Sequence, residues 1–182
     1  MSTKKIISRK IEIPNGTEIQ NNKGLITIKS NKGTLTRRFS NPALEIKIEQ
    51  DSLTISSRQN PSKNTKRIIN TVVSHIKNMI EGLQNPYTYK LKIVSGHFPM
   101  NVTIDKNIIV IKNFLGEKVP RKAKVLDGSK AEIKGDEITV TSINKELAGQ
   151  TAANIEMATR ITNKDRRIFS DGIFITQKAL RG

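Results

Sequence analysis

Residues 50–56 read QDSLTIS, and residues 135–141 read GDEITVT. Polar and apolar side chains alternate in both stretches, which predicts a half-buried β-strand because successive side chains of a strand point to opposite faces of its sheet. A second match runs in the same order: ITIK at residues 26–29 corresponds to IVIK at residues 109–112, and a glycine follows each after three intervening residues. The copies are offset by 85 and 83 residues. A duplication followed by a small insertion or deletion produces such offsets.

A helical pattern follows each set of strand patterns. Between Thr65 and Gly82 the apolar residues recur three and four positions apart, which predicts one amphipathic helix. We expect Ser62 or Asn64 to cap the start of this helix and Gly82 to end it. A second helix is expected from about Lys145 to Ile161, and four of its residues should share a buried face: Ala148, Ala152, Ile155 and Thr159.

Short β-strands resemble one another, so such matches can arise by chance, but the common order of strands and helix favours duplication. The expected fold is α+β, a tandem duplication of two small domains, each an antiparallel-rich β-sheet with one packed α-helix. The expected boundaries are 1–83 for the first domain, 84–90 for a connector, and 91–182 for a second domain that includes a basic C-terminal extension. Residues 11–56 should form one antiparallel meander, with a turn at residues 49–52.

The composition is strongly basic. The 182 residues include 32 Lys and Arg against 16 Asp and Glu, a net charge of +16, which implies a polyanionic partner: nucleic acid, an anionic membrane surface or an acidic protein. The cations are spread along the chain, whereas a membrane-surface binder usually gathers them on one amphipathic helix. Aromatic residues make up only 4%, which argues against a base-stacking platform. Recognition of RNA phosphates and RNA shape is therefore expected.

Several other classes of protein are disfavoured. The chain contains no Cys, which excludes disulfides and thiol chemistry. Its two histidines, His75 and His97, have no matched carboxylate or nucleophile motif beside them, and no phosphate-binding glycine motif is present. No signal-peptide core or long apolar stretch is found. We expect a soluble, intracellular protein that is not an enzyme and holds no cofactor or metal.

Two basic clusters in predicted loops of the second half are candidates for RNA contacts: Arg121-Lys122 with Lys124, and Lys164 with Arg166-Arg167. Loops that flank strands can hold guanidinium groups rigidly against phosphates. The segment Gly96-His97-Phe98-Pro99 has two interpretations. Phe98 is expected to anchor a rigid loop in the core, and His97 is then either structural or held outward toward RNA.

The small-residue run at 149–154 lies on the second predicted helix. Ala152 is expected to pack against the sheet, whereas Gln150 and Asn154, on another face, are candidates for RNA contact. In the first half, the basic helix face from Lys63 to Lys77 is the expected contact surface.

Five segments in this order are similar to a known family, the large-subunit ribosomal proteins numbered six (uL6) in their archaeal and eukaryotic form. The resemblance covers essentially the whole chain. The segments that carry it are GTLT at 33–36, HFP at 97–99, NFLGE at 113–117, GQTAANI at 149–155 and NKDRRIFSDGI at 163–173. The last replaces the Tyr-Lys-Gly-Lys-Gly stretch of bacterial members, so atomic contacts known for those members do not transfer to it.

The resemblance implies a structural constituent of the large subunit of the cytoplasmic ribosome. Its second domain would make most contacts with large-subunit rRNA, by the sarcin–ricin loop and the stalk base, next to neighbouring ribosomal proteins and close to where translational GTPases dock. No homo-oligomer or membrane association is expected. The alternative is a non-ribosomal RNA-binding module, such as an RNA chaperone or a translational regulator. The expected rRNA-binding residues are His97, Lys112, Arg121, Lys122, Lys124, Gln150, Asn154, Lys164, Arg166, Arg167 and Lys178.

Overall fold

A computed structural model describes residues 6–49, 52–58, 62–165 and 167–179. Contacts divide the chain into two compact units, Met1–Asn85 and Pro86–Gly182. The expected connector at 84–90 is wrong in extent, because helix α1 (Lys63–Gln84) and strand β7 (Tyr87–Val94) take up most of it. Asn85 is extended, the conformation that a following proline imposes, so the helix stops there and the strand begins at once.

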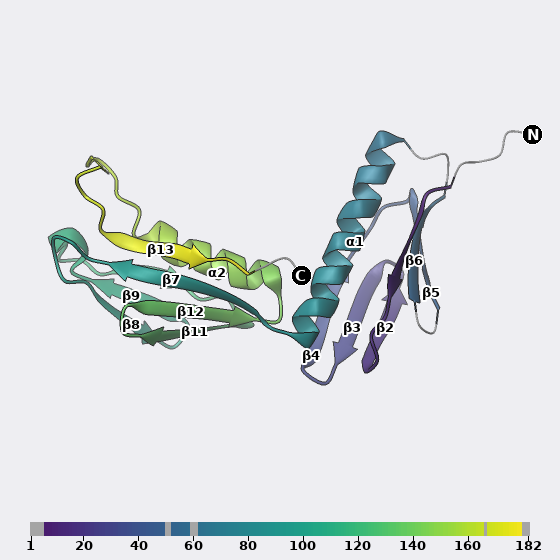
Figure 1. Cartoon of the computed structure of the whole chain (residues 1–182), viewed down its shortest axis with the longest axis horizontal. Helices are drawn as coiled ribbons and strands as arrows, with labels where there is room; N and C mark the ends of the chain where they lie inside the picture. The colour runs from purple at the N-terminus through teal and green to yellow at the C-terminus, as the bar shows by residue number, and fades with distance from the viewer. Residues whose placement is uncertain (1–5, 50–51, 59–61, 166, 180–182) are drawn as a thin grey trace, which may run out of the picture. The chain divides into compact units, whose positions relative to one another are not determined.

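The described residues of the first unit form six strands in two antiparallel three-stranded sheets (Figure 1). One sheet has the order β2-β3-β4, from Thr17–Asn22, Leu25–Ser30 and Gly33–Arg38. The other has the order β1-β6-β5, from Ser8–Glu12, Ser52–Ser57 and Leu44–Ile48. Helix α1 packs against strands of both sheets.

The prediction of a single meander over residues 11–56 is therefore wrong. β2, β3 and β4 pair in chain order, and so do β5 and β6, but β4 does not pair with β5, and β1 pairs with β6, from the other end of the segment. Alternating apolar residues reveal strands but not which strands pair, and pairing between segments far apart in sequence leaves no local signal. The turn expected at 49–52 includes residues 50 and 51, which lie outside the described residues.

The second unit repeats this architecture and adds one strand. Its larger sheet has the order β11-β12-β7-β13, with β11 at Ser129–Lys134, β12 at Glu137–Ser142 and β13 at Gly172–Gln177. Its smaller sheet has the order β10-β9-β8, from Arg121–Lys124, Ile108–Lys112 and Asn101–Asp105. A short 3₁₀ turn, η1 (Phe114–Gly116), follows β9, and helix α2 (Lys145–Ala158) packs on both sheets.

The tandem duplication is confirmed by strand order and by burial. The order β1-β6-β5 in the first unit equals β7-β12-β11 in the second, and β2-β3-β4 equals β8-β9-β10. The matched residues are all fully buried: Ile26 and Ile28 with Ile109 and Ile111, and Leu53 and Ile55 with Ile138 and Val140. Strand β13 has no counterpart among the described residues of the first unit.

The ends of α1 test the helix prediction. Ser62 is the N-cap, because its Oγ accepts a hydrogen bond from the backbone N–H of Thr65 at 3.1 Å, and Asn64 lies inside the helix. The expectation that Gly82 ends the helix is wrong. The helix continues to Gln84 because Leu83, which is fully buried, extends the apolar stripe by one residue beyond the glycine.

Helix α2 ends at Ala158, three residues before the predicted end. The buried residues of the helix are Ala148, Thr151, Ala152 and Ile155. Three of them were predicted, Thr151 was not, and the fourth predicted residue, Thr159, is also buried but follows the helix as its C-cap. Gly149 brings the helix close to the sheet, since a Cβ at this position would lie 3.1 Å from Tyr89 Oη on β7. The small residues of 149–154 therefore serve packing at Gly149 and Ala152, as expected for Ala152.

Candidate nucleic-acid interface

A buried carboxylate organises the loops at one end of the second unit. Asp171, whose side chain is 1% exposed, precedes β13 and accepts hydrogen bonds from the loop that follows β7. Its Oδ1 accepts from the backbone N–H groups of Gly96 and His97, and its Oδ2 lies 2.6 Å from His97 Nδ1. These contacts join residues 74 and 75 positions apart in the chain. The carboxylate thus fixes one loop to the other.

The hydrogen bonds determine the ionisation of Asp171. Burial acts to raise the pKa of this carboxyl group, because an ionised group loses its hydration in the interior. Hydrogen bonds from the backbone and ring of His97 and from the backbone of Gly96 outweigh burial, so the pKa of Asp171 lies below its ordinary value. Asp171 is therefore a charged acceptor, which makes its hydrogen bonds stronger than neutral ones.

The ring of His97 is held at the surface by this carboxylate. Its side chain is 39% exposed, and the ring centroids of His97 and Phe169 are 5.0 Å apart. Lys164 Nζ lies 4.7 Å from the Phe169 centroid, a cation–π contact. Two predicted site residues, His97 and Lys164, are thereby brought together on opposite loops.

The prediction that Phe98 is anchored in the core is wrong, because its side chain is 46% exposed. The ring instead covers Gly116, where a Cβ would lie 3.7 Å from it. Gly116 has φ +78°, and Leu115 before it also lies in the left-handed region at φ +50°. This conformation costs a non-glycine residue about 1–2 kcal/mol. Buried Phe114 holds this loop in place.

Arg121 is engaged within the protein rather than presented to solvent. Its guanidinium donates to both carboxylate oxygens of Glu117, at 2.7 and 2.6 Å, and to the carbonyl oxygens of Ala158 and Arg160, at 3.0 and 3.1 Å. It also stacks 4.3 Å from the centroid of Phe114. Arg121 therefore ties the η1 loop to the C-terminal end of α2, where free carbonyl groups need donors.

Glu117 completes this arrangement. Hydrogen bonds from Arg121 hold the pKa of Glu117 below its ordinary value; burial opposes the shift, and the charges of Arg121 and Lys164 add to it. With its bidentate partner and two carbonyl acceptors in place, Arg121 has little donor capacity left for a phosphate. The structure favours a positioning role for Arg121.

Three predicted lysines share the outer face of the β10-β9-β8 sheet. Lys122 and Lys124 alternate with buried Ala123 on β10, and Lys112 follows buried Ile111 at the end of β9. In the antiparallel register of β9 and β10, residues that point outward on one strand lie beside residues that point outward on the other. All three side chains are exposed, and none has an ion-pair partner in the described ranges.

The polar side chains of α2 lie at the end of β10. Asn154 Nδ2 donates to the carbonyl oxygen of Lys124 at 3.3 Å, and Gln150 Nε2 donates to Asn154 Oδ1 at 3.0 Å. Gln150 is exposed. The structure thus brings Lys124, Gln150 and Asn154 together. Polar side chains of α2 therefore lie next to the sheet face that carries Lys112, Lys122 and Lys124.

The remaining predicted residues are separate from that face. Arg167 is 90% exposed and pairs with Asp165, whose pKa its hydrogen bonds lower. Arg166 lies outside the described residues. Lys178 follows β13 at the end opposite the Asp171 loop, about 20 Å away at the usual rise per strand residue. The structure does not bring Lys178 into the loop cluster.

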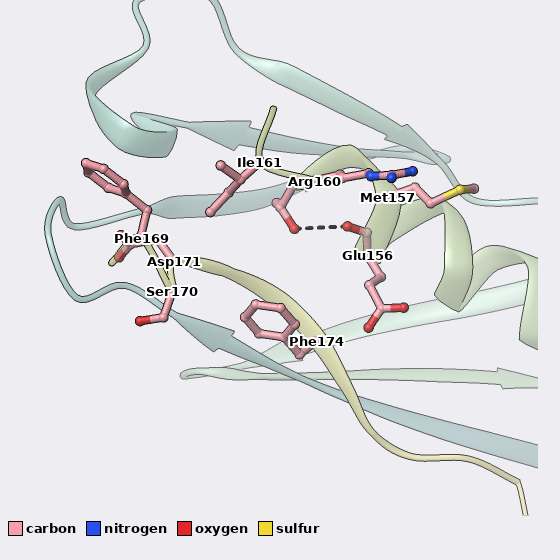
Figure 2. A pocket seen from close by; sticks show the side chains of 9 residues that line it. Glu156, Met157, Arg160, Ile161, Phe169, Ser170, Asp171 and Phe174 are labelled. Carbon is pink, nitrogen blue, oxygen red and sulfur yellow. Dashed lines mark hydrogen bonds between the residues drawn. The ribbon is translucent and has the colours of Figure 1, made fainter. Parts of the chain in front are cut away.

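A pocket of about 460 Å³ lies beside this loop cluster. Figure 2 shows Met157 and Arg160 on the α2 side of it and Phe169 and Phe174 on the other. At the edge of this pocket, two hydrogen bonds join the backbone of β13 to the C-terminal end of α2. Ile173 N–H donates to Thr159 Oγ1 at 2.9 Å, and Ile175 N–H donates to Glu156 Oε1 at 3.0 Å. The extension that the first unit lacks is therefore an integral part of the second core.

Sequence reasoning missed two residues that shape this site, Asp171 and Glu117. Both appeared only within the segments that carry the family resemblance, 163–173 and 113–117, and neither was assigned a role. A bidentate pair at a spacing of four residues, Glu117 and Arg121, was visible in the sequence as a possible partner pair. Nothing in the sequence connects Asp171 with His97.

The comparisons with known proteins agree with this architecture. The model of the family described as ribosomal protein L6 matches residues 13–85 and 98–172, one match in each unit. A relative from Methanococcus vannielii, named large ribosomal subunit protein uL6, is 44% identical over 174 residues, which is 96% of this chain and 95% of the relative. The proteins of the same name from Methanobrevibacter smithii and Methanosarcina mazei are also 44% identical, over 94% and 96% of this chain and 96% and 99% of their own lengths.

Both kinds of match extend across the two repeats. Because the family model covers most of the chain, it decides in favour of the ribosomal interpretation over the non-ribosomal one. Within the described part of the chain, no helix combines the length and apolar character needed to cross a membrane. The family model and the relatives show that the chain belongs to the ribosomal protein L6 (uL6) family and is a structural, non-enzymatic protein of the large subunit of the cytoplasmic ribosome.

Proposed function

We propose that this protein binds large-subunit rRNA next to the sarcin–ricin loop and the stalk base. We further propose that it supports the region where translational GTPases dock. The observation that carries the proposal is the outer face of the β10-β9-β8 sheet. There Lys112, Lys122 and Lys124 are exposed, and none of them has an ion-pair partner among the described residues. Such cations release counterions from RNA when they meet phosphates, which drives binding.

The loop cluster supplies the second part of the proposed interface. His97 and Lys164 are positioned by Asp171 and Phe169, and exposed Arg167 lies in the same connection between α2 and β13. We assign phosphate contacts to the lysines and to Arg166 and Arg167, and hydrogen bonds to sugar or base edges to His97, Gln150 and Asn154. Arg121 is assigned a positioning role because its donors are occupied by Glu117 and the end of α2.

Sedimentation of a low-salt lysate tests the proposed location. The protein should travel with the large subunit, and its absence from that peak would contradict the proposal. Binding of the purified chain to an rRNA fragment that contains the sarcin–ricin loop and the stalk base then tests the interface. A double variant, Lys122→Gln with Lys124→Gln, should flatten the dependence of log K on log salt by about 0.7–0.9 for each lost phosphate contact.

A matched control uses two exposed lysines of β11 in the same unit, Lys130→Gln with Lys134→Gln, which removes the same charge and should leave the salt slope near that of the wild type. Replacement of Arg166 and Arg167 with Ala should also weaken binding and flatten the slope. An unchanged slope in both test variants would assign the contact to a different surface.

A further inference from the structure

The outer face of α1 in the first unit carries four cations. Lys63, Lys66, Arg67 and Lys77 are all exposed. At 3.6 residues per turn they fall within roughly a third of the helix circumference. This arc lies opposite the buried stripe that packs on the sheets, which is formed by Ile69, Val72, Ile76, Met79, Ile80 and Leu83.

Very little negative charge compensates these cations. The helix contains a single acid, Glu81, near its C-terminal end, and its first turn contains none. The helix dipole adds partial positive charge at the N-terminal end, where three of the cations lie. None of the four side chains has an ion-pair partner among the residues that the structure describes. The face therefore combines positive charge with free donors.

The fold does not require this charge. Helix α2 occupies the same position in the second repeat, yet its one cation, Lys145, lies over the ring of Tyr87, 4.9 Å from the centroid. It also carries acids near both ends, Glu146 and Glu156. The basic face is thus a property of the first repeat alone.

The chemistry of the face favours RNA over an acidic protein. Protein interfaces are usually built around aromatic or aliphatic anchors and contain few lysines. None of the large exposed apolar side chains in the described residues belongs to α1. The positions between the cations hold small polar groups, among them Asn70 and Ser74, both exposed. Cations from Lys63 to Lys77 span about 21 Å along the helix axis, long enough to meet several successive phosphates.

We propose that the outer face of α1 binds the phosphate backbone of an rRNA helix, so that each repeat makes its own contact with RNA. This inference rests on the proposed rRNA-binding function. It adds an RNA site to the repeat whose loops carry none of the candidates described above. Phosphate contacts of this kind fix position and carry little sequence information.

A cysteine crosslink gives the most direct test. The natural chain has no Cys, so Ser74→Cys places a single thiol in the middle of the basic face, and a photoactivatable group can be attached to it. Large subunits that have incorporated the labelled full-length chain should yield a crosslink to rRNA. Lys47→Cys, exposed on β5, is the matched control and should give little or none.

The outcomes separate this inference from the proposed function. Incorporation into the large subunit with a crosslink from residue 74 only to a protein, or with no crosslink, would overturn the α1 site and leave the proposed function intact. Failure of the unlabelled chain to enter the large subunit would overturn both. A crosslink to rRNA from residue 74 that is absent from residue 47 supports the α1 site.

Binding in solution provides a second measurement. The triple variant Lys66→Gln, Arg67→Gln, Lys77→Gln should bind the same rRNA fragment more weakly and with a salt slope shallower by about 2. Glutamine keeps helix propensity close to that of Lys and Arg, so the helix should persist. The control Lys10→Gln, Lys29→Gln, Lys47→Gln removes equal charge from strands of the same unit. Equal losses in both triple variants would overturn the inference.

Discussion

The two repeats share a strand order but differ in how they use charge. In the second, acids and bases are paired across loops, Asp171 with His97 and Glu117 with Arg121, and the extra strand β13 covers one edge of β7. In the first, four cations without an ion-pair partner among the described residues share the outer face of α1. Burial constrains the core positions to apolar residues, whereas surface charges are free to differ. The duplication therefore preserved the cores and allowed the surfaces to specialise.

The core equivalence can be tested first, because it predicts the largest effect. Ile28→Ala and Ile111→Ala remove matched, fully buried side chains, and each should lower the free energy of unfolding of its own unit by about 3 kcal/mol. Both tyrosines of the chain, Tyr87 and Tyr89, lie on β7. Tyrosine fluorescence in urea should therefore detect the loss in Ile111→Ala. An equal shift in Ile28→Ala would contradict separate unfolding of the repeats.

The next effect concerns the buried carboxylate of the second repeat, which has no counterpart among the described residues of the first. Asp171→Ala leaves the backbone N–H groups of Gly96 and His97 without their acceptor, which should lower the free energy of unfolding by about 2–3 kcal/mol. Hydrogen exchange should accelerate at both amides and remain unchanged in the first repeat. Asp105→Ala, at an exposed position of β8, is the control and should change stability little.

Arg121 sharpens the distinction between positioning and binding. Arg121→Gln loses the bidentate contact with Glu117 and the stacking on Phe114, which should lower the free energy of unfolding by about 1–2 kcal/mol. Under conditions in which this variant is fully folded, the slope of log K for RNA binding against log salt should stay near the wild-type value. The variant at Lys122 and Lys124 should differ in this respect. A slope that falls by the same amount would show that Arg121 contacts phosphate directly.

The smallest effect is a dependence on pH. The folded-state pKa of Asp171 lies below that of an unfolded chain, which is about 3.9. Its contribution is therefore fully present above the unfolded pKa and is lost as pH falls through the folded pKa. The melting temperature reported by tyrosine fluorescence should decrease on acidification below about pH 4, and this decrease should be smaller in Asp171→Asn. An identical decrease would place the acid sensitivity at other carboxylates.

Much of the fold could be predicted from the sequence. Alternation and helical spacing identified the duplicated strands and both helices, and three of the four residues predicted for the buried face of α2 lie on it. The pairing of β1 with β6 could not be predicted, because nothing local to either strand specifies its partner. Gly82 misled the prediction of the end of α1, since buried Leu83 outweighs the helix-ending tendency of a glycine.

The candidate site was less accessible to sequence reasoning. Basic residues could be listed, but their roles depend on neighbours distant in the chain. Arg121 and Lys122 are adjacent in sequence and belong to one basic cluster, yet one points inward to Glu117 and α2 and the other faces out from the sheet. Strand alternation explains that difference once the core face of β10 is known.

The contact between Asp171 and His97 also sets an order of events during synthesis. Strand β7 and its loop leave the translating ribosome long before residue 171, and closing a contact across 74 residues is slower than forming the local hairpins of β8, β9 and β10. Until β13 has been made and added beside β7, His97 has no carboxylate to hold it. The loop end of the second repeat therefore forms later than those hairpins, so a nascent chain acquires this part of its binding surface only after β13 has been translated.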